Sequence, residues 1–549
     1  MRPNKRFLTR TAYLLFLVSF GCSDKPVETP DIINIYEGIE FEMPVVIEPV
    51  FPDYAVSITD FGAVSDGQTL NTEAFAEAIA DVDEKGGGRV LIPRGLWLTG
   101  PIILKSNINL HIESGALMIF SKDKDLYPLT KSNWEGWKTV RCLSPISGKD
   151  LENIAITGEG VFDGLGSVWQ HIKRSKLTEK QWNKLVNSGG IVSEDGKNWY
   201  PSESYLKGLE ARKMLGPWFS DNIEDYQDTR DFYRPVLVSL LSCNKVLLDG
   251  PVFQNSAAWN LHPLLCENLT VRNVTVRNPW YSSNGDGIDI ESCKNSVVYN
   301  CTFDVGDDAI CIKSGKDKEG RDRGKPTENL IVKNCVVYHG HGGVTIGSEM
   351  SGGVKNMHVS GCTFMGTDVG LRFKSKRGRG GVVENIYISN IDMIDIPTNA
   401  ISFNLYYGGL SVSEMLEQSE NKDVETEIYP VTEETPQFKD ISIKNITCKG
   451  AEQAIYMQGL PEMNLENFQM ENLTIESEKG LFCMDANNIS IYGLILICNN
   501  YPALTFYNAK NVNVEGLELS DPAQSGISVN GDKTENIRIN GKSIDKAEN

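Results

Sequence analysis

The chain has 549 residues, and 40% apolar with only 23% charged residues give ample material for a folded core. Its formal net charge of −20 argues against nucleic acid as a partner, because phosphate binding needs a dominant basic surface. The length alone suggests several ordinary domains. Elongated repeat folds grow in one direction, however, so length leaves the number of domains open.

The N-terminus has the pattern of an export signal. Basic residues precede an apolar run, residues 11–20, that is too short to span a bilayer. Gly21-Cys22-Ser23 follows and resembles a bacterial lipoprotein processing site, which predicts a signal peptide over residues 1–22 and a lipid on Cys22. Residues 23–52 are rich in proline and predict a tether. We therefore expect an exported protein, anchored to the bacterial outer membrane only by that lipid, on a membrane face that the sequence leaves open.

A repeat fills residues 53–549. The phrase Asn-apolar-x-apolar mostly recurs every 21 to 29 residues, and a second phrase, small-apolar-x-apolar, runs out of phase with it, as at residues 287–290, 309–312, 343–346 and 370–373. The 55-residue step from Asn385 to Asp440 is interpreted as two turns of the repeat. Short strands of this period bury their apolar faces only when coils stack. The repeat predicts an all-β fold, a single-stranded right-handed parallel β-helix (solenoid); a leucine-rich repeat lacks its leucine consensus here, and propeller blades need about 40 residues.

Three segments depart from the repeat. Residues 71–82 have helical spacing behind Asn71 and predict a helix that caps the N-terminal end of the coil. Residues 165–231 predict a partly helical insertion whose tryptophans form either a small core or platforms for sugar stacking: Trp169, Trp182, Trp199 and Trp218. A shorter acidic insertion is expected at residues 408–436.

The cysteines are predicted to be core thiols. Of the 12 cysteines, Cys22 belongs to the signal, and the odd number that remains would suggest disulfides with one thiol left over. Cys301, Cys335 and Cys362 nevertheless fall in a column of the repeat that otherwise holds aliphatic residues. That position favours burial in the core.

Acidic residues gather where the second phrase begins. Aligning Gly287 with Ala309 places Asp286 over Asp308, and Asp307 under His341 of the next coil. Neighbouring coils lie about 4.8 Å apart, so the carboxyl groups crowd one patch, where mutual repulsion raises one pKa and separates an acid from a base. Because consecutive residues of a strand face opposite ways, Asp307 and Asp308 also require a bend.

Basic residues follow on the next strand. Arg372 and Lys374 alternate along it and point outward, and arginine offers a planar fork suited to a sugar carboxylate. Arg372 and Lys374 belong to the second of two basic clusters in the sequence. Taken alone, each cluster is expected to be a solvated loop. The first contains Lys313, Lys316, Lys318, Arg321, Arg323 and Lys325, and the second contains Arg372, Lys374, Lys376, Arg377 and Arg379.

Four short motifs occur in order: Asn284-Gly285-Asp286, Gly306-Asp307-Asp308, Gly340-His341-Gly342 and Arg372-Phe373-Lys374. With these motifs in this order, the chain resembles the members of glycoside hydrolase family 28, the polygalacturonases, and the similarity extends over nearly all of its mature length. Gly285 stands where the family has threonine, and Phe373 where it has isoleucine. The first departure leaves the preference for substrate open.

The resemblance implies inverting hydrolysis of a pectic polysaccharide or oligogalacturonide by a monomer without cofactor or metal. By this carry-over Asp307 is the acid, Asp286 and Asp308 hold the attacking water, and His341 sustains the protonation or the orientation of the acid. Arg372, Lys374 and Tyr407 bind the substrate, with the adjacent Tyr406 as the alternative to Tyr407.

Four functions are weighed. The first is an exo-acting galacturonidase, because the insertion at 165–231 would wall off one end of a groove. A rhamnogalacturonan hydrolase is the nearest alternative, since Gly285 departs from the polygalacturonase pattern. A Ca²⁺-dependent pectate lyase and a non-catalytic β-helix adhesin are the others.

Overall fold

The computed structural model describes residues 34–408, 427–520 and 526–544. Gly38–Asn549 form one compact unit and Met1–Glu37 another. The predicted signal peptide, Cys22 and most of the insertion at 408–436 lie outside the described residues. Among the residues that are described, no helix has the length and apolar character needed to cross a bilayer.

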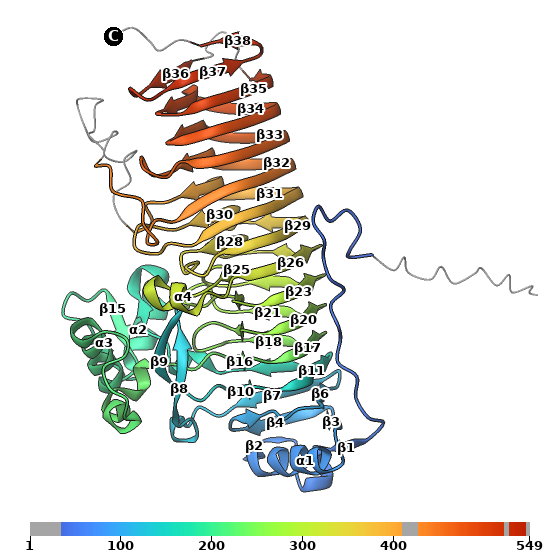
Figure 1. The fold of residues 1–549 in the computed structure, drawn as a ribbon. Helices are drawn as coiled ribbons and strands as arrows, with labels where there is room; N and C mark the ends of the chain where they lie inside the picture. Colours follow the sequence, from blue (N-terminus) through green and yellow to red (C-terminus); the bar gives the residue numbers. More distant parts are fainter. Residues whose placement is uncertain (1–33, 409–426, 521–525, 545–549) are drawn as a thin grey trace, which may run out of the picture. The chain divides into compact units, whose positions relative to one another are not determined.

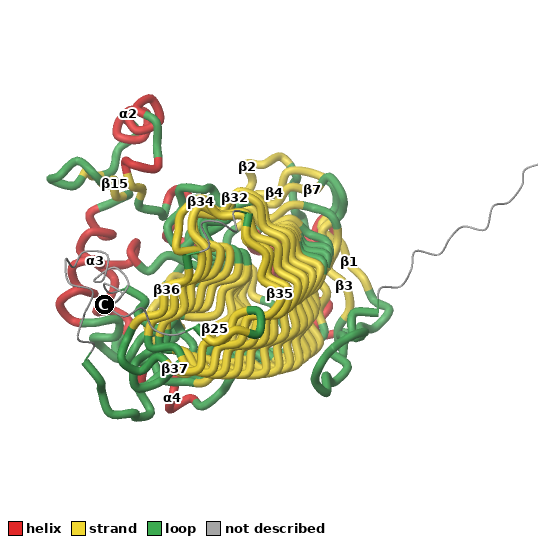
Figure 2. Tube along the Cα trace, turned by 90° about the horizontal axis from the view of Figure 1, so that it is seen from above, coloured by secondary structure: helices red, strands yellow, loops and turns green. Residues whose placement is uncertain are grey.

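The strands of the larger unit stack as a right-handed parallel β-helix, which confirms the predicted fold class (Figures 1 and 2). Each strand pairs in parallel with the equivalent strand of the next coil, so the strands form three rows. The first row contains β1 (Ala55–Ser57), β3 (Gly88–Ile92), β6 (Ile108–Ile112), β11 (Glu152–Gly158), β17 (Asn244–Asp249), β20 (Glu267–Arg272), β23 (Lys294–Tyr299) and β26 (Thr327–Lys333). The second contains β2 (Asp66–Leu70), β4 (Gly95–Thr99), β7 (Ala116–Phe120), β12 (Val161–Asp163), β18 (Val252–Gln254), β21 (Thr275–Arg277), β24 (Thr302–Asp304) and β27 (Val336–Val337). The third contains β5 (Ile102–Ile103), β10 (Ile146–Lys149), β16 (Val238–Leu241), β19 (Leu261–Leu264), β22 (Ile288–Glu291), β25 (Ile310–Lys313), β28 (Val344–Gly347) and β30 (Leu371–Lys374).

Toward the C-terminus the rows merge into long strands that run through most of a coil. These are β29 (Val354–Met365), β31 (Val382–Asn404), β32 (Gln437–Gln458), β33 (Leu465–Met484), β34 (Ala486–Tyr507) and β35 (Lys510–Leu519), closed by β36 (Ile527–Asn530), β37 (Glu535–Ile539) and β38 (Lys542–Ser543). Ile386 of β31 pairs directly with Ile441 of β32. The interpretation of residues 385–440 as two turns is therefore wrong, because the chain leaves one coil after β31 and returns to the next at β32.

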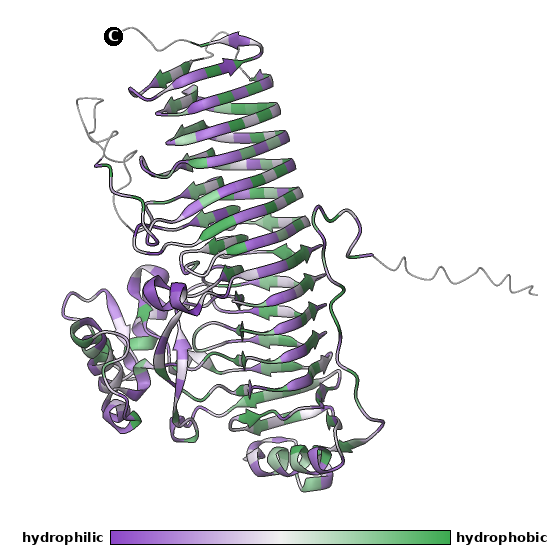
Figure 3. Cartoon of the chain, in the orientation of Figure 1, coloured by the Kyte–Doolittle hydropathy of each residue, from purple (hydrophilic) through white to green (hydrophobic). Residues whose placement is uncertain are grey.

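Apolar and polar residues alternate along the strands (Figure 3), and the apolar side chains fill the inside of the coil. Equivalent residues stack from coil to coil, as Phe162 does on Phe253 with ring centroids 5.3 Å apart. Cys301, Cys335 and Cys362 lie in this core, and every cysteine among the described residues is free and buried. The prediction of core thiols is confirmed.

The recurring asparagines form hydrogen-bonded ladders at the turns. Asn329 donates its side-chain N–H to Asn295 Oδ1 at 2.9 Å, and Asn356 donates to Asn329 Oδ1 at 3.0 Å. All three have positive φ, near 54 to 58°, a conformation that asparagine tolerates better than most residues. The repeat therefore marks turns that need both a left-handed backbone and a stacked amide.

Helix α1 (Thr72–Glu84) closes the N-terminal end, as predicted. It places Phe75, Ile79 and Val82 in the core of the coil. The side chain of Asn71 makes no capping hydrogen bond, although it stands at the N-cap. It donates instead to the carbonyl oxygens of Val64 and Leu98, and so ties the helix start to the first coils.

Excursions from the coil cluster on one side of it (Figures 1 and 2). Between β12 and β16 lie η3 (Gly166–Val168), β13 (Ile172–Lys173), η4 (Arg174–Lys176), α2 (Glu179–Asn187), β14 (Ile191–Val192), β15 (Asn198–Tyr200), α3 (Glu203–Leu215) and η5 (Ile223–Phe232). The sequence did not predict the antiparallel hairpin of β8 (Leu129–Trp134) and β9 (Trp137–Cys142), nor α4 (Asp317–Arg323). Two short 3-10 turns, η1 (Ile58–Phe61) and η2 (Lys124–Leu126), complete the elements.

The tryptophans of the insertion are core residues. Trp182 and Trp199 pack with Ile172, while Trp169 packs in a second cluster against which Trp218 lies partly buried. The sequence left open whether these tryptophans form a small core or platforms for sugar stacking, and in the structure they form small apolar cores.

The end of the predicted tether is not free chain. Glu48 forms a salt bridge of 2.5 Å with Arg272, and His358 shares a hydrogen bond of 2.6 Å with Glu40. Residues 38–52 therefore run against the coils, because their side chains find partners there, and a tether can extend only N-terminal to them.

Candidate active site

The third row of strands carries the candidate site. Ile288, Ile310, Val344 and Leu371 pair in succession across β22, β25, β28 and β30. Just before these strands, Gly287 N donates to Asp308 O at 3.0 Å and His341 N donates to Asp307 O at 2.9 Å. The stacking inferred from the repeat is thus confirmed at the backbone.

The chain bends at residues 306 and 307, before β25 begins. The bend separates the two adjacent aspartates. Asp308 is 1% exposed and faces the basic side chains of β30, whereas Asp307 lines an open cavity. The bend that the sequence required therefore creates one buried and one accessible carboxyl group.

Asp308 is held ionised by two cations. Lys374 Nζ lies 2.6 Å from one carboxylate oxygen, and Arg372 Nη1 lies 3.0 Å from the other. Thr345 donates its hydroxyl to the same carboxylate at 3.0 Å. Burial would raise the pKa of Asp308, but Lys374 and Arg372 outweigh it and hold the pKa well below the usual range.

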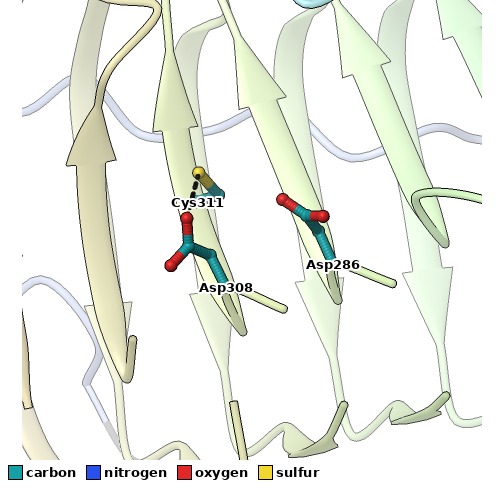
Figure 4. Close-up of side chains that lie close together, drawn as sticks. All are labelled: Asp286, Asp308 and Cys311. Carbon is teal, nitrogen blue, oxygen red and sulfur yellow. Dashed lines mark hydrogen bonds between the residues drawn. The ribbon is translucent and has the colours of Figure 1, made fainter. Parts of the chain in front are cut away.

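Asp286 faces Asp308 from the neighbouring coil (Figure 4). Oxygens of the two carboxyl groups and Cys311 Sγ all lie within 4.8 Å of one another. Burial, and then the nearby charges of Asp289 and Asp307, raise the pKa of Asp286. Since a hydrogen bond spans about 2.8 Å, a single water can bond to both carboxyl groups at once.

The same three side chains form a group that could in principle hold a metal ion. The donor set fits a divalent cation poorly, because Asp308 is already paired with Lys374 and Arg372. The structure thus favours a water between the carboxyl groups.

Beneath the site lies a buried ion network. Lys313 Nζ is 3.1 Å from Glu349 and 3.5 Å from Asp289. Arg379 pairs with Asp317, and the side chains of Lys313 and Arg379 are only 5% and 6% exposed. The expectation that both basic clusters are solvated loops is therefore wrong for these members, because buried carboxylates draw the cations inward.

His341 hydrogen-bonds through Nδ1 to Asp368 of the next coil. This bond raises the pKa of His341; burial opposes the rise and the charge of Asp307 adds to it. The protonated imidazole is therefore more stable beside Asp307 than in a free histidine.

Tyr407 lies over the two cations of β30. Its ring centroid is 5.0 Å from Lys374 Nζ and 5.9 Å from the Arg372 guanidinium carbon. Tyr406 instead faces Arg377 at 5.3 Å. Of the two adjacent tyrosines, Tyr407 is the one in the site.

The insertion contributes directly to the cavity beside Asp307. This cavity of about 300 Å³ is lined by Asp307 and His341 on one side and by His171, Lys173 and Lys176 of the insertion on the other. Trp280, which is 50% exposed, also lines it. An acidic sugar in this cavity would meet cations and an aromatic face as well as the carboxyl group of Asp307.

Gly285 is explained by its neighbour. A Cβ at this position would lie 1.9 Å from Ser282 Oγ, which itself donates to Pro279 O at 2.7 Å. The glycine is needed because Ser282 occupies the space of the side chain.

Comparison with known proteins agrees with this geometry. The family model described as glycosyl hydrolases family 28 matches residues 216–491. The chain is 25% identical over 488 residues to a probable polygalacturonase of Vitis vinifera, covering 85% of this chain and 86% of that one. It is 26% identical over 490 residues to an exo-poly-alpha-D-galacturonosidase of Dickeya chrysanthemi, covering 85% and 75%.

Among solved structures, the hyperthermoactive exopolygalacturonase of Thermotoga maritima superposes with a TM-score of 0.63 at 28% identity, covering 91% of this chain and 95% of that one. The family 28 exopolygalacturonase of Yersinia enterocolitica shares the fold, with a TM-score of 0.64 at 22% identity over 90% and 79% of the two chains. The chain is an enzyme, a glycoside hydrolase. It belongs to glycosyl hydrolases family 28.

Sequence reasoning missed Asp368, although a signal existed. Gly340 bridges to Thr367, so Asp368 occupies the same register position as His341 and Asp307. Extending the alignment of the second phrase by one coil would have found it. His171, Lys173 and Lys176 carried no such signal, because the insertion is outside the repeat.

Proposed function

We propose that this enzyme is an exo-acting polygalacturonase that hydrolyses α-galacturonosyl linkages in pectin. One observation carries the proposal: an accessible carboxyl group, Asp307, lines a cavity that the insertion walls with the cations Lys173 and Lys176. The exo-acting relatives from Dickeya and Thermotoga support it.

In the proposed mechanism Asp307 protonates the leaving oxygen from the open cavity. Asp308 accepts a proton from a water held between it and Asp286, and the water attacks from the opposite face of the sugar, which inverts the anomeric centre. His341 favours its charged form through Asp368 and stabilises the ionised state of Asp307 once the proton has left.

Arg372, Lys374 and Tyr407 are proposed to bind the substrate. Lys374 donates to Asp308 and Arg372 uses one of its nitrogens there, so both retain N–H donors for a sugar carboxylate. Such a carboxylate would share the cations with Asp308.

The test is digestion of polygalacturonate, with the released sugars followed over time. Early release of monomer or dimer, with the inverted anomer detected by NMR, is expected. A ladder of mixed oligomers would refute exo action. Release of sugar from rhamnogalacturonan fragments alone would identify the enzyme as a rhamnogalacturonan hydrolase. An unsaturated product whose formation stops in chelator would indicate a lyase.

We further propose that the mature enzyme is an exported monomer that begins at a lipid-bearing Cys22, with residues 1–21 removed. The pattern of basic residues, apolar run and Gly21-Cys22 supports this. Replacing Cys22 with alanine should release the enzyme from the membrane fraction of a bacterial host, and retention there would refute the anchor.

A further inference from the structure

A second cavity, of about 210 Å³, lies beside the catalytic cavity. His171 and Asn284 line both, so the two cavities lie on either side of this pair of side chains. His171 is fixed by Tyr205, whose hydroxyl lies 2.7 Å from Nδ1, and by Ser283, 3.3 Å from Nε2. The second cavity is therefore a built space that continues the substrate region beneath the insertion.

Its lining is cationic. Arg141, Arg212 and Arg234 all contribute to it, against the single carboxylate of Glu135. Glu135 is already taken, because Arg212 lies 2.7 Å from it and Lys316 lies 3.4 Å from it. Within the described part of the chain, neither Arg141 nor Arg234 forms a salt bridge.

Arg141 is buried yet leaves most of its donors unused. A guanidinium has five N–H groups. One nitrogen of Arg141 donates to the carbonyl oxygen of Arg234, while Nε is buried without a partner. The guanidinium carbon lies 3.6 Å from the ring centroid of Trp134, and the residue is 6% exposed.

Arg234 is positioned beside the catalytic loop. It donates to Ala257 O at 2.8 Å, to Ser283 O at 3.1 Å and to Asn284 Oδ1 at 3.1 Å. Asn284 stands two residues before Asp286. A group bound by Arg234 is thus coupled through one side chain to the loop that presents a catalytic carboxyl group.

Two buried guanidinium groups without a counter-ion are costly, since burial and their mutual repulsion lower the pKa of Arg141. A bound anion would remove that cost, and a planar carboxylate matches the guanidinium fork. Trp134 and Tyr205 add aromatic surface for a sugar ring.

We propose that this cavity binds the carboxylate of a uronic acid at the end of the substrate chain, as a subsite separate from Arg372 and Lys374. The inference rests on the proposed function, because a polymer of acidic sugars places a carboxylate on each unit. On this proposal the end of the substrate chain is recognised by Arg141, Arg212 and Arg234, which line the cavity between the hairpin and the insertion.

The experiment uses the full wild-type chain and isothermal titration with D-galacturonate, D-glucuronate and neutral D-galactose, which have no glycosidic bond to hydrolyse. Both uronates should bind and galactose should not. R141M should weaken uronate binding about 10- to 100-fold, the loss expected for a hydrogen bond to a charged group, without lowering the melting temperature. R277M, which removes an exposed arginine, is the matched control and should bind as the parent does.

K374M separates the two carboxylate sites. If K374M abolishes all uronate binding while R141M leaves it intact, the proposal is overturned. A lower melting temperature of R141M with unchanged affinity would equally overturn it and leave Arg141 as a stacking residue of Trp134. R141K, which keeps the charge but loses the fork, should fold and bind about 10-fold more weakly, so it serves if R141M does not fold. Binding of uronates is measured directly and does not depend on cleavage. Failure of the wild type to cleave polygalacturonate would therefore refute the proposed function, while the titrations would still decide whether this cavity binds a uronate.

Discussion

The coils of the candidate active site, which contain β22, β25, β28 and β30, and the C-terminal coils, from β31 onward, share one row of strands but use it differently. Asp289, Cys311, Thr345 and Arg372 align across β22, β25, β28 and β30. The same position continues as Ser402, Tyr456 and Phe482. There the side chains stack on one another, as Tyr456 does on Phe482 at 5.4 Å.

The contrast shows that the row of strands fixes how far apart equivalent side chains lie and which way they point, but does not fix which residue types stand there. In the coils of the candidate active site short strands are separated by loops, and a bend, an insertion and a hairpin gather around them. In the C-terminal coils the strands are long and run through most of each coil (Figure 1), and the insertion between β31 and β32 lies mostly outside the described residues. Chemistry therefore resides where the repeat is interrupted.

The largest effect is expected from removal of the proposed acid. D307N should lower kcat about 10²- to 10⁴-fold, since general acid catalysis contributes that much, and should leave the fold unchanged. D304N is the control, because Asp304 lies in the same coil and pairs with His339 outside the site. Equal activity of the two variants would remove Asp307 from the mechanism.

The next effect concerns the charge of Asp308. Its depressed pKa contributes stability above the unfolded pKa, and this stability is lost as the pH falls through the folded pKa. K374M removes one cation, so the pKa of Asp308 should rise. The acidic limb of the kcat/KM profile and the onset of acid unfolding should both move to higher pH. K376M, at an exposed lysine two residues on, should move neither.

A smaller effect is expected at the histidine. Asp368 raises the pKa of His341, which therefore contributes stability that is complete below the unfolded pKa and is lost as the pH rises through the folded pKa. D368N should lower kcat about 10-fold and move the alkaline limb of the activity profile to lower pH. The control is D304N, which removes the carboxylate from the exposed pair of His339 and Asp304. If the pH profiles of activity of D368N and D304N coincide, Asp368 has no role in positioning His341.

The smallest effect lies in the C-terminal coils and touches stability alone. Asn472 has positive φ and donates to Asn445 Oδ1 at 3.2 Å, and the next coil has Gly493 at the equivalent position. N472A should cost about 1 to 2 kcal/mol of unfolding free energy, because it loses the hydrogen bond and strains the backbone. N472G should cost less. Chemical denaturation checks the order, and pectin cleavage should be unchanged in both variants.

The sequence by itself determined the stacked coils, the core thiols and the alignment of Asp286, Asp307, Asp308 and His341. It could do so because a repeat converts position along the chain into position in space. The same logic reached Arg372 and Lys374, which lie one coil further on.

Only the tertiary structure decided what lies between repeats. The pairing of Arg372 and Lys374 with Asp308, the choice of Tyr407 over Tyr406, and the cations that the insertion brings to the cavity depend on loops without periodicity. Neighbouring charges decided the ionisation, because Asp286 and Asp308 are both buried but only Asp308 has Lys374 and Arg372 beside it, so the pKa of Asp286 is raised and that of Asp308 is lowered.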